Sequence, residues 1–526
     1  MKRRSFLKSS LTLGGAAAAS AGLGACSAEQ SAGVATDSAP AAANGPLAGY
    51  TKLGKIQPRS SDQIESSYWG VQAGAYDEET LDKARAIGVK WTRVLAGWPN
   101  VEKEKGRYEW ADLDTAIDAL LRYGITPFVT MTRGNPLYTR VGTYDDPKLA
   151  AIYGDSPAPP TEPDAVAAWL EFVGATIERY KDRIRYWEIW NEPNHRNYWG
   201  APPNAADYGN LVRVTSELIR ELHPDAKIIA GSTAGISASF HDGYLGQCDP
   251  SVLDIISFHN YGNRPEDRVY RLARFREVLD KHNPDLEVWQ GECGIASQSR
   301  TTGYRGTGPW GETIQAKWLL RQSFVDTYFC GATLSNYFKL FSDGELDPPK
   351  TERELSDLDK VFGAQERGGS RMHARGVNEK CILYAADRSP KPAYYAYQNL
   401  CAAMDARYQK EELVYAFDVQ DAGSFHGIGK YEDAFPSVPL LASFRSAGGT
   451  LLAIWLPWIP QEAVSEFARV SLDVETAFSE PVLLDLLSGD VYALADFESD
   501  GRKTRFGNLP LADYPFVVVE RSEIAL

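Results

Sequence analysis

Two stretches of the chain, Tyr186-Trp187-Glu188-Ile189-Trp190-Asn191-Glu192-Pro193-Asn194 and Leu286-Glu287-Val288-Trp289-Gln290-Gly291-Glu292-Cys293-Gly294, are built alike. Each begins as a short apolar run typical of a buried strand and reaches a glutamate near its end. Pro193 cannot continue a strand ladder, so Glu192 falls at the carboxyl end of the first strand. Glu292 ends the second strand and is soon followed by a glycine, which leaves room for a ligand to approach.

Between about residue 67 and residue 405, short apolar runs alternate with amphipathic stretches at helical spacing, which predicts βα units around a parallel sheet. Eight such strands over roughly 270 residues favour a (β/α)8 TIM barrel over an open sheet. The predicted strands cover residues 67–73, 90–95, 125–131, 185–191, 226–231, 253–259, 286–292 and 331–338. Strands four and seven then place Glu192 and Glu292 in one cleft at the face where barrel enzymes carry their catalytic groups.

The rest of the chain divides into recognisable segments. The chain has 526 residues, of which 44% are hydrophobic, enough for a large domain and a smaller one. We expect the barrel over residues 49–405, with a final helix at 392–404 and a long insertion at 342–380. Short strands and turns beyond residue 406 predict an all-β sandwich over 406–526. Residues 49–66 are expected to pack on that β-domain.

The first 26 residues contain targeting signals and are not expected to be part of the folded domains. Arg3-Arg4-Ser5-Phe6-Leu7-Lys8 resembles the twin-arginine export signal, and Leu23-Gly24-Ala25-Cys26 resembles the bacterial lipobox, in which the cysteine is acylated. Residues 27–48 read as a flexible tether. We therefore expect an exported lipoprotein, on the periplasmic or cell-surface side, that contacts the membrane through its lipid anchor only. The alternative is an ordinary cleaved signal with a chance cysteine.

Composition narrows the partners and cofactors. The formal net charge is −15, which argues against general binding of nucleic acid. The remaining five cysteines match no metal-binding spacing, and the sequence has no HExxH motif, phosphate loop or calcium loop. We expect no metal and no cofactor, and free thiols at Cys248, Cys293, Cys330, Cys381 and Cys401.

The two glutamates suit glycoside hydrolysis, which uses a pair of carboxyl groups. Burial beside aromatic rings is expected to raise the pKa of Glu192 toward that of a working general acid. A pair about 5–5.5 Å apart retains the anomeric configuration, and a wider pair inverts it. The sequence alone leaves this separation open.

The strand-four Asn-Glu-Pro and the strand-seven Glu resemble clan A of the glycoside hydrolases over roughly residues 65–405. The Trp-Asn-Glu-Pro-Asn form and the trailing β-domain are similar to family 39, which contains β-xylosidases. The resemblance implies a retaining O-glycosidase with Glu192 as acid/base and Glu292 as nucleophile. It also implies that Asn191 binds the sugar 2-hydroxyl, that Arg93 supports the nucleophile, that Tyr261 bonds Glu292, and that His259 lines the sugar site. One departure is Gly291, where the β-xylosidase relatives usually have threonine.

Further expectations concern the substrate. Trp98, Tyr198, Trp199 and Trp310 fall in loops of the predicted active face and are expected to stack on sugar rings. Basic residues also follow the strand ends, which suggests an anionic glycan such as a uronate-bearing or sulfated one; these residues are Arg133, His195, Arg196, Arg264, Arg300, Arg305 and Lys339. The alternatives are a non-catalytic surface glycan-binding lipoprotein, which a missing carboxylate would have favoured, and a transglycosylase using the same chemistry.

Overall fold

The computed structural model describes residues 45–141, 156–262, 264–297, 311–342, 379–421, 438–462 and 467–526. The signal segment 1–26 with Cys26, nearly all of the tether 27–48, Trp310, Arg300, Arg305 and most of the 342–380 insertion lie outside the described residues. No helix within the described ranges is long and apolar enough to cross a membrane.

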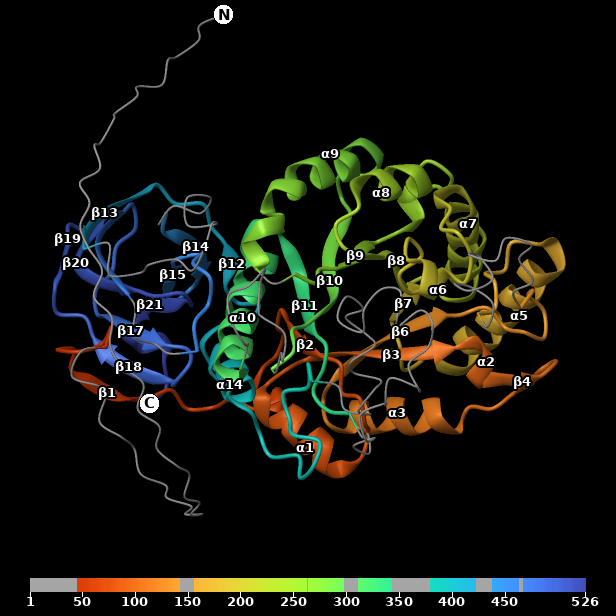
Figure 1. Cartoon of the computed structure of the whole chain (residues 1–526), viewed down its shortest axis with the longest axis horizontal. Helices are drawn as coiled ribbons and strands as arrows, with labels where there is room; N and C mark the ends of the chain where they lie inside the picture. Colours follow the sequence, from red (N-terminus) through yellow and green to blue (C-terminus); the bar gives the residue numbers. More distant parts are fainter. Residues whose placement is uncertain are drawn as a thin grey trace, which may run out of the picture. The chain divides into compact units, whose positions relative to one another are not determined.

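Eight parallel strands close into a barrel, with the order β10-β11-β2-β3-β6-β7-β8-β9 around the ring (Figure 1). The predicted (β/α)8 barrel is therefore confirmed, and each predicted strand overlaps an observed one. The strands are β2 (Trp69–Val71), β3 (Trp91–Gly97), β6 (Thr126–Thr132), β7 (Tyr186–Ile189), β8 (Lys227–Ala234), β9 (Ile255–His259), β10 (Glu287–Cys293) and β11 (Ala332–Tyr337).

Helices surround the barrel because each buries one apolar stripe against the strands. In α5, for example, Trp169, Val173, Ile177 and Tyr180 are all fully buried. The helices are α1 (Glu78–Ile87), α2 (Trp98–Val101), α3 (Ala111–Arg122), α5 (Pro163–Tyr180), α6 (Arg196–Trp199), α7 (Ala205–Leu222), α8 (Ala238–Leu245), α9 (Leu272–His282), α10 (Glu312–Phe324) and α14 (Pro392–Ala403). Shorter helical turns include η3 (Pro265–Arg271) and a π-helical turn, η5 (Val325–Phe329).

An apolar layer fills the barrel near the amino ends of its strands. Phe128, Ile229, Ile255, Trp289 and Leu334 come from five different strands and form one buried cluster. The ring of Trp289 lies 5.4 Å from that of Phe128, centroid to centroid. Because this apolar layer fills the barrel near the amino ends of the strands, polar side chains can gather only near their carboxyl ends.

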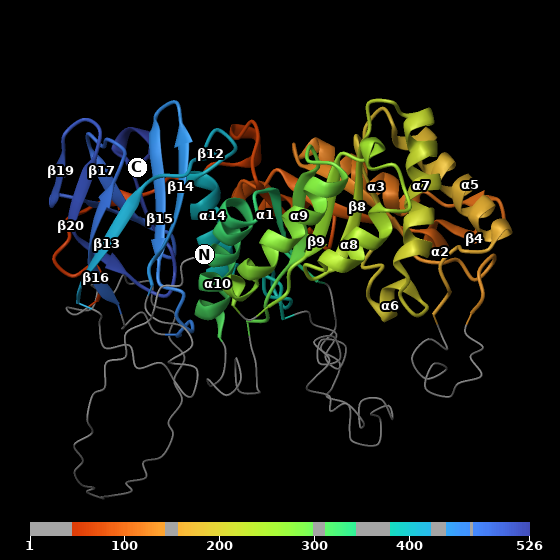
Figure 2. The same cartoon turned by 90° about the horizontal axis from the view of Figure 1, so that it is seen from above.

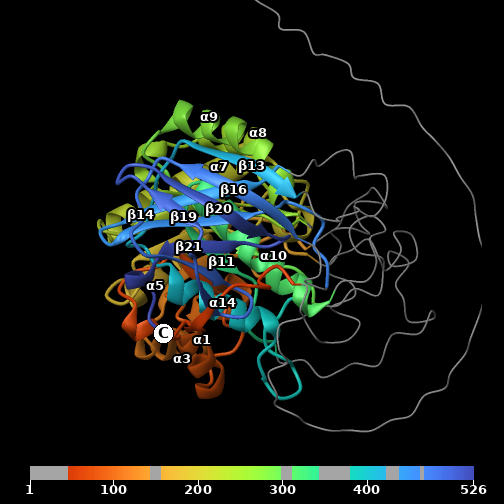
Figure 3. The same cartoon turned by 90° about the vertical axis from the view of Figure 1, so that its left-hand side faces the viewer.

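The C-terminal part of the chain forms two antiparallel sheets, so the predicted all-β domain is also confirmed. A seven-stranded sheet has the order β1-β18-β17-β21-β15-β14-β12, and a four-stranded sheet has the order β13-β16-β20-β19; Figure 3 looks onto these strands. Strand β1 (Lys52–Lys55) pairs with β18, so the chain before the barrel contributes an edge strand to this domain. The other strands are β12 (Gln409–Lys410), β13 (Tyr415–Asp421), β14 (Leu440–Ser446), β15 (Gly449–Trp455), β16 (Ala468–Val474), β17 (Pro481–Asp485), β18 (Asp490–Ala493), β19 (Phe497–Ser499), β20 (Thr504–Leu511) and β21 (Phe516–Glu520).

Helices α10 and α14 lie between the barrel strands and the β-domain (Figures 1 and 2). Buried charges on α10 bond to the β-domain: Lys317 Nζ lies 2.7 Å from Asp513 Oδ1, and Arg321 Nη1 donates to the Trp458 carbonyl at 2.7 Å. Arg321 also pairs with Glu266 of η3 at 2.6 Å. The Trp455 indole donates to the same glutamate at 2.8 Å. One helix therefore bonds to the β-domain and to the segment that follows β9.

Candidate active site

Polar side chains from six neighbouring strands meet at the carboxyl end of the barrel. They come from β3, β6, β7, β8, β9 and β10, which are consecutive around the ring. They include every residue that the sequence analysis placed in the catalytic centre, and three that it did not single out; in chain order they are Arg93, Thr130, Glu188, Asn191, Glu192, Ser232, His259, Tyr261 and Glu292.

Arg93 is the hub of this cluster. Its side chain is fully buried, and the guanidinium donates to Glu188 Oε2 at 2.5 and 2.7 Å. The Nη1 group also donates to Asn191 Oδ1 at 2.8 Å and to Glu292 Oε2 at 2.9 Å. A planar guanidinium with five N–H groups can hold several partners in fixed directions, as it does here.

Glu292 receives donors on both carboxylate oxygens. Arg93 bonds Oε2, and the Tyr261 hydroxyl donates to Oε1 at 2.6 Å. Burial and the adjacent Glu292 charge raise the pKa of Tyr261 well above its usual value, so this phenol stays protonated and remains a donor. The carboxylate of Glu292 is thereby fixed in orientation, and its side chain is still 16% exposed.

Glu192 is held by an unusual backbone. Trp190 and Glu192 have φ values of 71° and 46°, in the left-handed region that non-glycine residues seldom adopt. Such strain costs on the order of 1–3 kcal/mol per residue and clusters at functional sites. It turns the chain sharply after β7, and the Glu192 carboxylate accepts a hydrogen bond of 2.9 Å from His259 Nδ1.

The expected rise in the pKa of Glu192 is wrong for this state of the protein. Burial does raise it, but the hydrogen bond that His259 donates and the nearby Arg93 charge outweigh burial, so the pKa of Glu192 is lowered. The sequence argument included the loss of water around Glu192. It did not include the donor that folding places beside the carboxylate.

The two carboxylates lie close together. Single ligand-type atoms of Glu192, His259 and Glu292 are all within 4.8 Å of one another, so a carboxylate oxygen of each glutamate is within that distance of the other. This spacing favours the narrow arrangement of retaining glycosidases over the wide one of inverting enzymes. The same three residues could also be read as cation ligands, but the Arg93 guanidinium already occupies Glu292 and would repel a second cation.

Gly291, the departure from the family pattern, has a local explanation. A Cβ built at position 291 would lie 2.4 Å from Ser257 Oγ, which is closer than atoms can approach. It would also lie 3.5 Å from both Glu188 Oε1 and His259 Nε2. The space that a threonine would need is therefore filled by the hydroxyl of Ser257 on the neighbouring strand.

Aromatic rings and cations flank the two carboxylates. Burial raises the pKa of Tyr198 to about 12, and the nearby charges of Glu192 and Glu292 add to this rise. The Arg133 guanidinium lies 5.0 Å above this ring. Lys380 Nζ lies 4.7 Å above the ring of Tyr261. Burial lowers the pKa of Lys380, and the charges of Glu292 and Glu192 oppose that fall, so this ammonium belongs to the same site.

Two of the tryptophans predicted to stack on sugars do not line the opening. Trp98 is fully buried, donates to Glu102 at 2.6 Å and stacks on Tyr138. Trp199 is 1% exposed and packs against Trp190 with ring centroids 5.1 Å apart. Both rings are buried among other aromatic residues and have almost no exposed surface, so the prediction is wrong for them.

The basic residues predicted around the face have different environments. Arg133 and Arg196 are exposed, and His195 and Lys339 are half-buried. Arg264 is 2% exposed and forms an ion pair with Asp267 at 3.4 Å, so it serves the packing of η3. Of the predicted basic residues that the structure describes, Arg133 and Arg196 are exposed, and Lys380 adds a cation that the sequence analysis did not name.

The sequence analysis did not single out four residues of the site, Thr130, Glu188, Ser232 and Lys380. Glu188 was overlooked because it stands inside an apolar strand sequence. An acidic residue in such a run is itself a sign that the folded protein buries it beside a partner. Thr130 and Ser232 carry no sequence signal. Lys380 lies at the end of the long insertion, where no strand or helix pattern places it.

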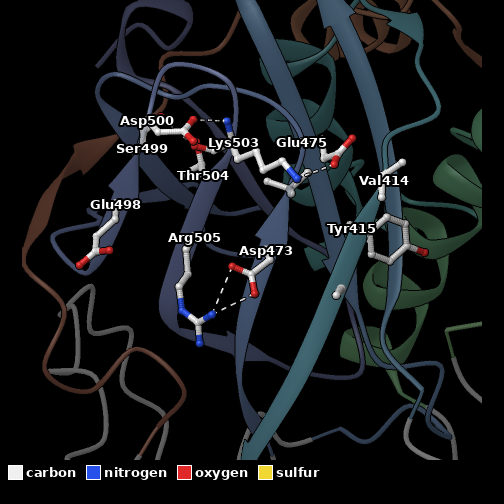
Figure 4. Close-up of a pocket in the computed structure, with 12 residues that line it drawn as sticks. Val414, Tyr415, Asp473, Glu475, Glu498, Ser499, Asp500, Lys503, Thr504 and Arg505 are labelled. Carbon is white, nitrogen blue, oxygen red and sulfur yellow. Dashed lines mark hydrogen bonds and ion pairs between the residues drawn. The ribbon is translucent and has the colours of Figure 1, made fainter.

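A separate hollow of about 580 Å³ lies on the β-domain and is lined by β13, β16, β19 and β20 (Figure 4). Its charged groups pair with each other: Lys503 lies 2.7 Å from Glu475, and Arg505 lies 3.0 Å from Asp473. These pairs explain the hollow as an ordinary solvated sheet surface.

Comparison with known proteins agrees with this geometry. The family model described as "Glycosyl hydrolases family 39" matches residues 50–280. A β-xylosidase of Geobacillus stearothermophilus is 22% identical over 202 residues, which are 36% of this chain and 38% of that protein. β-Glucosidase A of Thermotoga maritima is 26% identical over 204 residues, 36% of this chain and 42% of that protein. The matched regions thus span less than half the length of these curated relatives.

Solved structures show the same fold. A family 39 glycoside hydrolase from the gut symbiont Bacteroides cellulosilyticus WH2 superposes with a TM-score of 0.57 at 18% identity, covering 86% of this chain and 81% of that one. A family 30 endoxylanase from Clostridium papyrosolvens C71 gives 0.55 at 11% identity, covering 89% and 97%. Residues 50–280 thus match the model of the family 39 glycosyl hydrolases, the family that the Trp-Asn-Glu-Pro-Asn motif at the end of the fourth barrel strand resembles.

Proposed function

We propose that the protein is a retaining glycoside hydrolase, with Glu192 as acid/base and Glu292 as nucleophile. The observation that carries the proposal is the pair of carboxylates from β7 and β10, within 4.8 Å of each other and held by different partners. Arg93 and Tyr261 hold Glu292 by its oxygens, whereas His259 holds Glu192 by one oxygen. Different surroundings give two carboxyl groups different pKa values, so that one can act as an acid and the other as a nucleophile.

The reaction follows from these positions. Glu292 attacks the anomeric carbon while Glu192 donates its proton to the leaving oxygen, giving a glycosyl ester on Glu292. Glu192, now ionised, takes a proton from water, which then cleaves the ester and restores both groups. Because Arg93 fixes the oxygen of Asn191, the amide NH2 of Asn191 is the group that would donate to the sugar 2-hydroxyl. No cofactor is needed for these steps.

The lowered pKa of Glu192 belongs to the protein without substrate. A bound sugar displaces water from the carboxylate, and desolvation raises the pKa of such a group. Substrate binding is therefore expected to help Glu192 take up the proton that the first step needs.

Replacement of the nucleophile tests the assignment. We expect Glu292→Gly to abolish turnover, and azide to restore part of it by forming a glycosyl azide. Turnover would be followed with aryl β-D-xylosides and aryl β-D-glucosides, the sugars in the names of two relatives. Full activity of Glu292→Gly without azide would refute the role of this residue. Proton NMR of the first-formed anomer in the wild type distinguishes retention from inversion.

The acid/base role has its own signature. Glu192→Ala should spare the first step for substrates with good leaving groups, which need no proton, and slow it for poor ones. Equal losses on both kinds of substrate would contradict the role. Products longer than the substrate would indicate a transglycosylase, and sugar binding without any turnover would indicate a glycan-binding protein.

An anionic glycan is the finer proposal for the substrate. Two cationic groups lie over aromatic rings of the site: Lys380 over the ring of Tyr261, and Arg133 over the ring of Tyr198. A uronate or sulfate group on the substrate would find charge complementarity there. Comparison of kcat/KM on neutral and uronate-bearing oligosaccharides tests this, and faster turnover of the neutral ones would remove the idea.

Export and anchoring remain proposals from the sequence of residues 1–26. The twin-arginine and lipobox motifs support a lipoprotein acylated at Cys26 that works on oligo- or polysaccharides outside the cytoplasm. Cys26→Ser should move the protein from the membrane fraction to the soluble fraction. Unchanged fractionation would contradict the anchor.

A further inference from the structure

Ser232 occupies a strained position on β8, directly beside the acid/base. Its φ is 48°, in the left-handed region, although it is not a glycine. Gly231 before it has φ 94°, and a Cβ there would meet the Ser257 carbonyl oxygen at 2.6 Å. The Glu192 amide donates to the Ser232 carbonyl at 2.9 Å, so the two strained residues are bonded to each other. Strain kept at a fully buried serine points to a use for its hydroxyl.

That hydroxyl connects two groups of the catalytic centre. Arg93 Nη2 donates to Ser232 Oγ at 2.9 Å, and Ser232 Oγ lies 3.0 Å from His259 Nε2. The other ring nitrogen, His259 Nδ1, lies 2.9 Å from Glu192 Oε1. The side chains of Arg93 and His259 are fully buried. The contacts therefore form a continuous chain from Arg93 through Ser232 and His259 to Glu192.

The direction of donation along this chain follows from its two ends. Arg93 can only donate, so one lone pair of Ser232 Oγ is occupied. Glu192 as a carboxylate can only accept, so His259 Nδ1 must carry a hydrogen. In a neutral imidazole the other nitrogen then has a lone pair, and Ser232 can donate its hydroxyl hydrogen to it. All three bonds then point toward Glu192 Oε1.

We propose that Ser232 is a positioning residue that holds His259 in its neutral Nδ1–H tautomer. Resting on the proposed function, this assigns the two oxygens of Glu192: Oε1 accepts from His259, and Oε2 carries the proton that passes to the leaving group. Without the serine donor, His259 can also place its hydrogen on Nε2. The imidazole then turns a lone pair toward Glu192 and competes for the catalytic proton.

The tautomer can be read without any substrate. In the full chain labelled with [15N]histidine, protonated and unprotonated ring nitrogens differ widely in 15N shift, and the His259 signals are assigned by their loss in His259→Gln. We expect hydrogen on Nδ1 and none on Nε2 in the wild type, and mixed tautomers in Ser232→Ala. Hydrogen on Nε2 in the wild type, or an unchanged pattern in Ser232→Ala, would overturn the proposal.

A matched control stands on the next residue. Thr233 Oγ1 lies 2.9 Å from Nε2 of another buried histidine, His241, which the catalytic centre does not include. Thr233→Val thus removes a comparable buried hydroxyl–imidazole bond from the same strand. It is expected to leave the His259 tautomer unchanged. Ser232→Gly, which suits a positive φ, serves as the second variant in case Ser232→Ala fails to fold.

Kinetics provide the second readout. On phenyl β-D-xyloside, which has a poor leaving group, we expect Ser232→Ala to lower kcat/KM by about ten- to a hundredfold. On 2,4-dinitrophenyl β-D-xyloside the loss should stay below about threefold, because departure of that group needs little protonation. Equal losses on both xylosides would contradict the assignment of Oε2. If the wild type cleaves neither these xylosides nor the aryl β-D-glucosides and uronate-bearing oligosaccharides named above, the proposed function is contradicted, and the tautomer still decides the role of Ser232.

Discussion

A single guanidinium holds the catalytic centre together. Arg93 bonds side chains on four other barrel strands or the turns that follow them, and it has no exposed surface. Removing one partner from a buried charge network leaves the others uncompensated, which is costly. At the scale of one residue, the order of the site and the stability of the barrel therefore depend on the same side chain.

Arg93→Lys tests this dependence. A lysine keeps the positive charge but presents one nitrogen in place of the fork, so most of the bonds are lost. We expect the free energy of unfolding in urea to fall by about 3 kcal/mol, with loss of activity. Arg213→Lys, at an exposed pair with Glu217, is the control and should change stability by less than about 1 kcal/mol. If the two substitutions changed stability equally, stability would not depend on the bonds that Arg93 makes.

Tyr261→Phe isolates one donor to the nucleophile. It removes the hydroxyl that lies 2.6 Å from Glu292 and keeps the ring beneath Lys380. A hydrogen bond to a charged group contributes about 1.5–3 kcal/mol, so kcat should fall by about ten- to a hundredfold. Tyr397→Phe, which removes the buried hydroxyl that bonds the Gly70 carbonyl, is the matched control and should affect stability rather than kcat. Unchanged kcat in Tyr261→Phe would exclude this donor from the reaction.

At the scale of elements, the strands were predictable because a parallel barrel buries them on both faces, which leaves continuous apolar runs in the sequence. Glu192 and Glu292 could be placed because each ends such a run. The contacts between strands could not be placed: Ser232 bonds His259 only because β8 and β9 are neighbours. The burial of Trp98 followed from aromatic rings on other elements, Tyr138 and Trp169, which a local pattern does not reveal.

The π-helical turn η5 carries a buried acid that is not part of the site. Gln322 and Ser335 hydrogen-bond Asp326, but burial dominates and raises the pKa of Asp326 to about 8. In the unfolded chain the pKa of an aspartate is about 3.9. Between these values the folded state keeps a proton that the unfolded chain releases. Stability therefore falls as the pH rises through this window, by about 1.4 kcal/mol per pH unit.

Asp326→Asn should remove this pH dependence, because an amide resembles the protonated acid and cannot ionise. We expect the variant to match the wild type near pH 4 and to exceed its stability increasingly toward pH 8, in urea titrations at several pH values. Asp225→Asn, at an exposed position, is the control. Parallel pH curves for wild type and Asp326→Asn would show that Asp326 is ionised in the folded protein.

At the scale of the whole molecule, the β-domain and the barrel are joined through buried charges. Lys317 of α10 is fully buried against Asp513, while Arg321 bonds both the β-domain and η3. The Trp318 indole also donates to the Gly262 carbonyl at 2.7 Å, next to Tyr261. The β-domain therefore supports the segment that carries the donor to Glu292.

Asp513→Ala is expected to destabilise both domains together. It leaves the Lys317 ammonium buried without its carboxylate, at a cost of about 3–5 kcal/mol. The thermal transition should shift downward and remain single. Asp473→Ala, which breaks the exposed pair with Arg505, should cost less than about 1 kcal/mol. Two separate transitions in Asp513→Ala would show that the domains unfold independently.

The residues that position 291 can accept depend on the side chain at position 257. Because a Cβ there would collide with the Ser257 hydroxyl, Gly291→Ala should be harmful alone and tolerated together with Ser257→Gly, a case of epistasis that a double-mutant cycle can measure. On this expectation Gly291→Ala is tolerated only after Ser257→Gly, so the order of the two changes matters. Where a larger residue precedes the nucleophile in a related barrel, we expect a smaller residue opposite it on the sixth strand, so the two positions should vary as a pair.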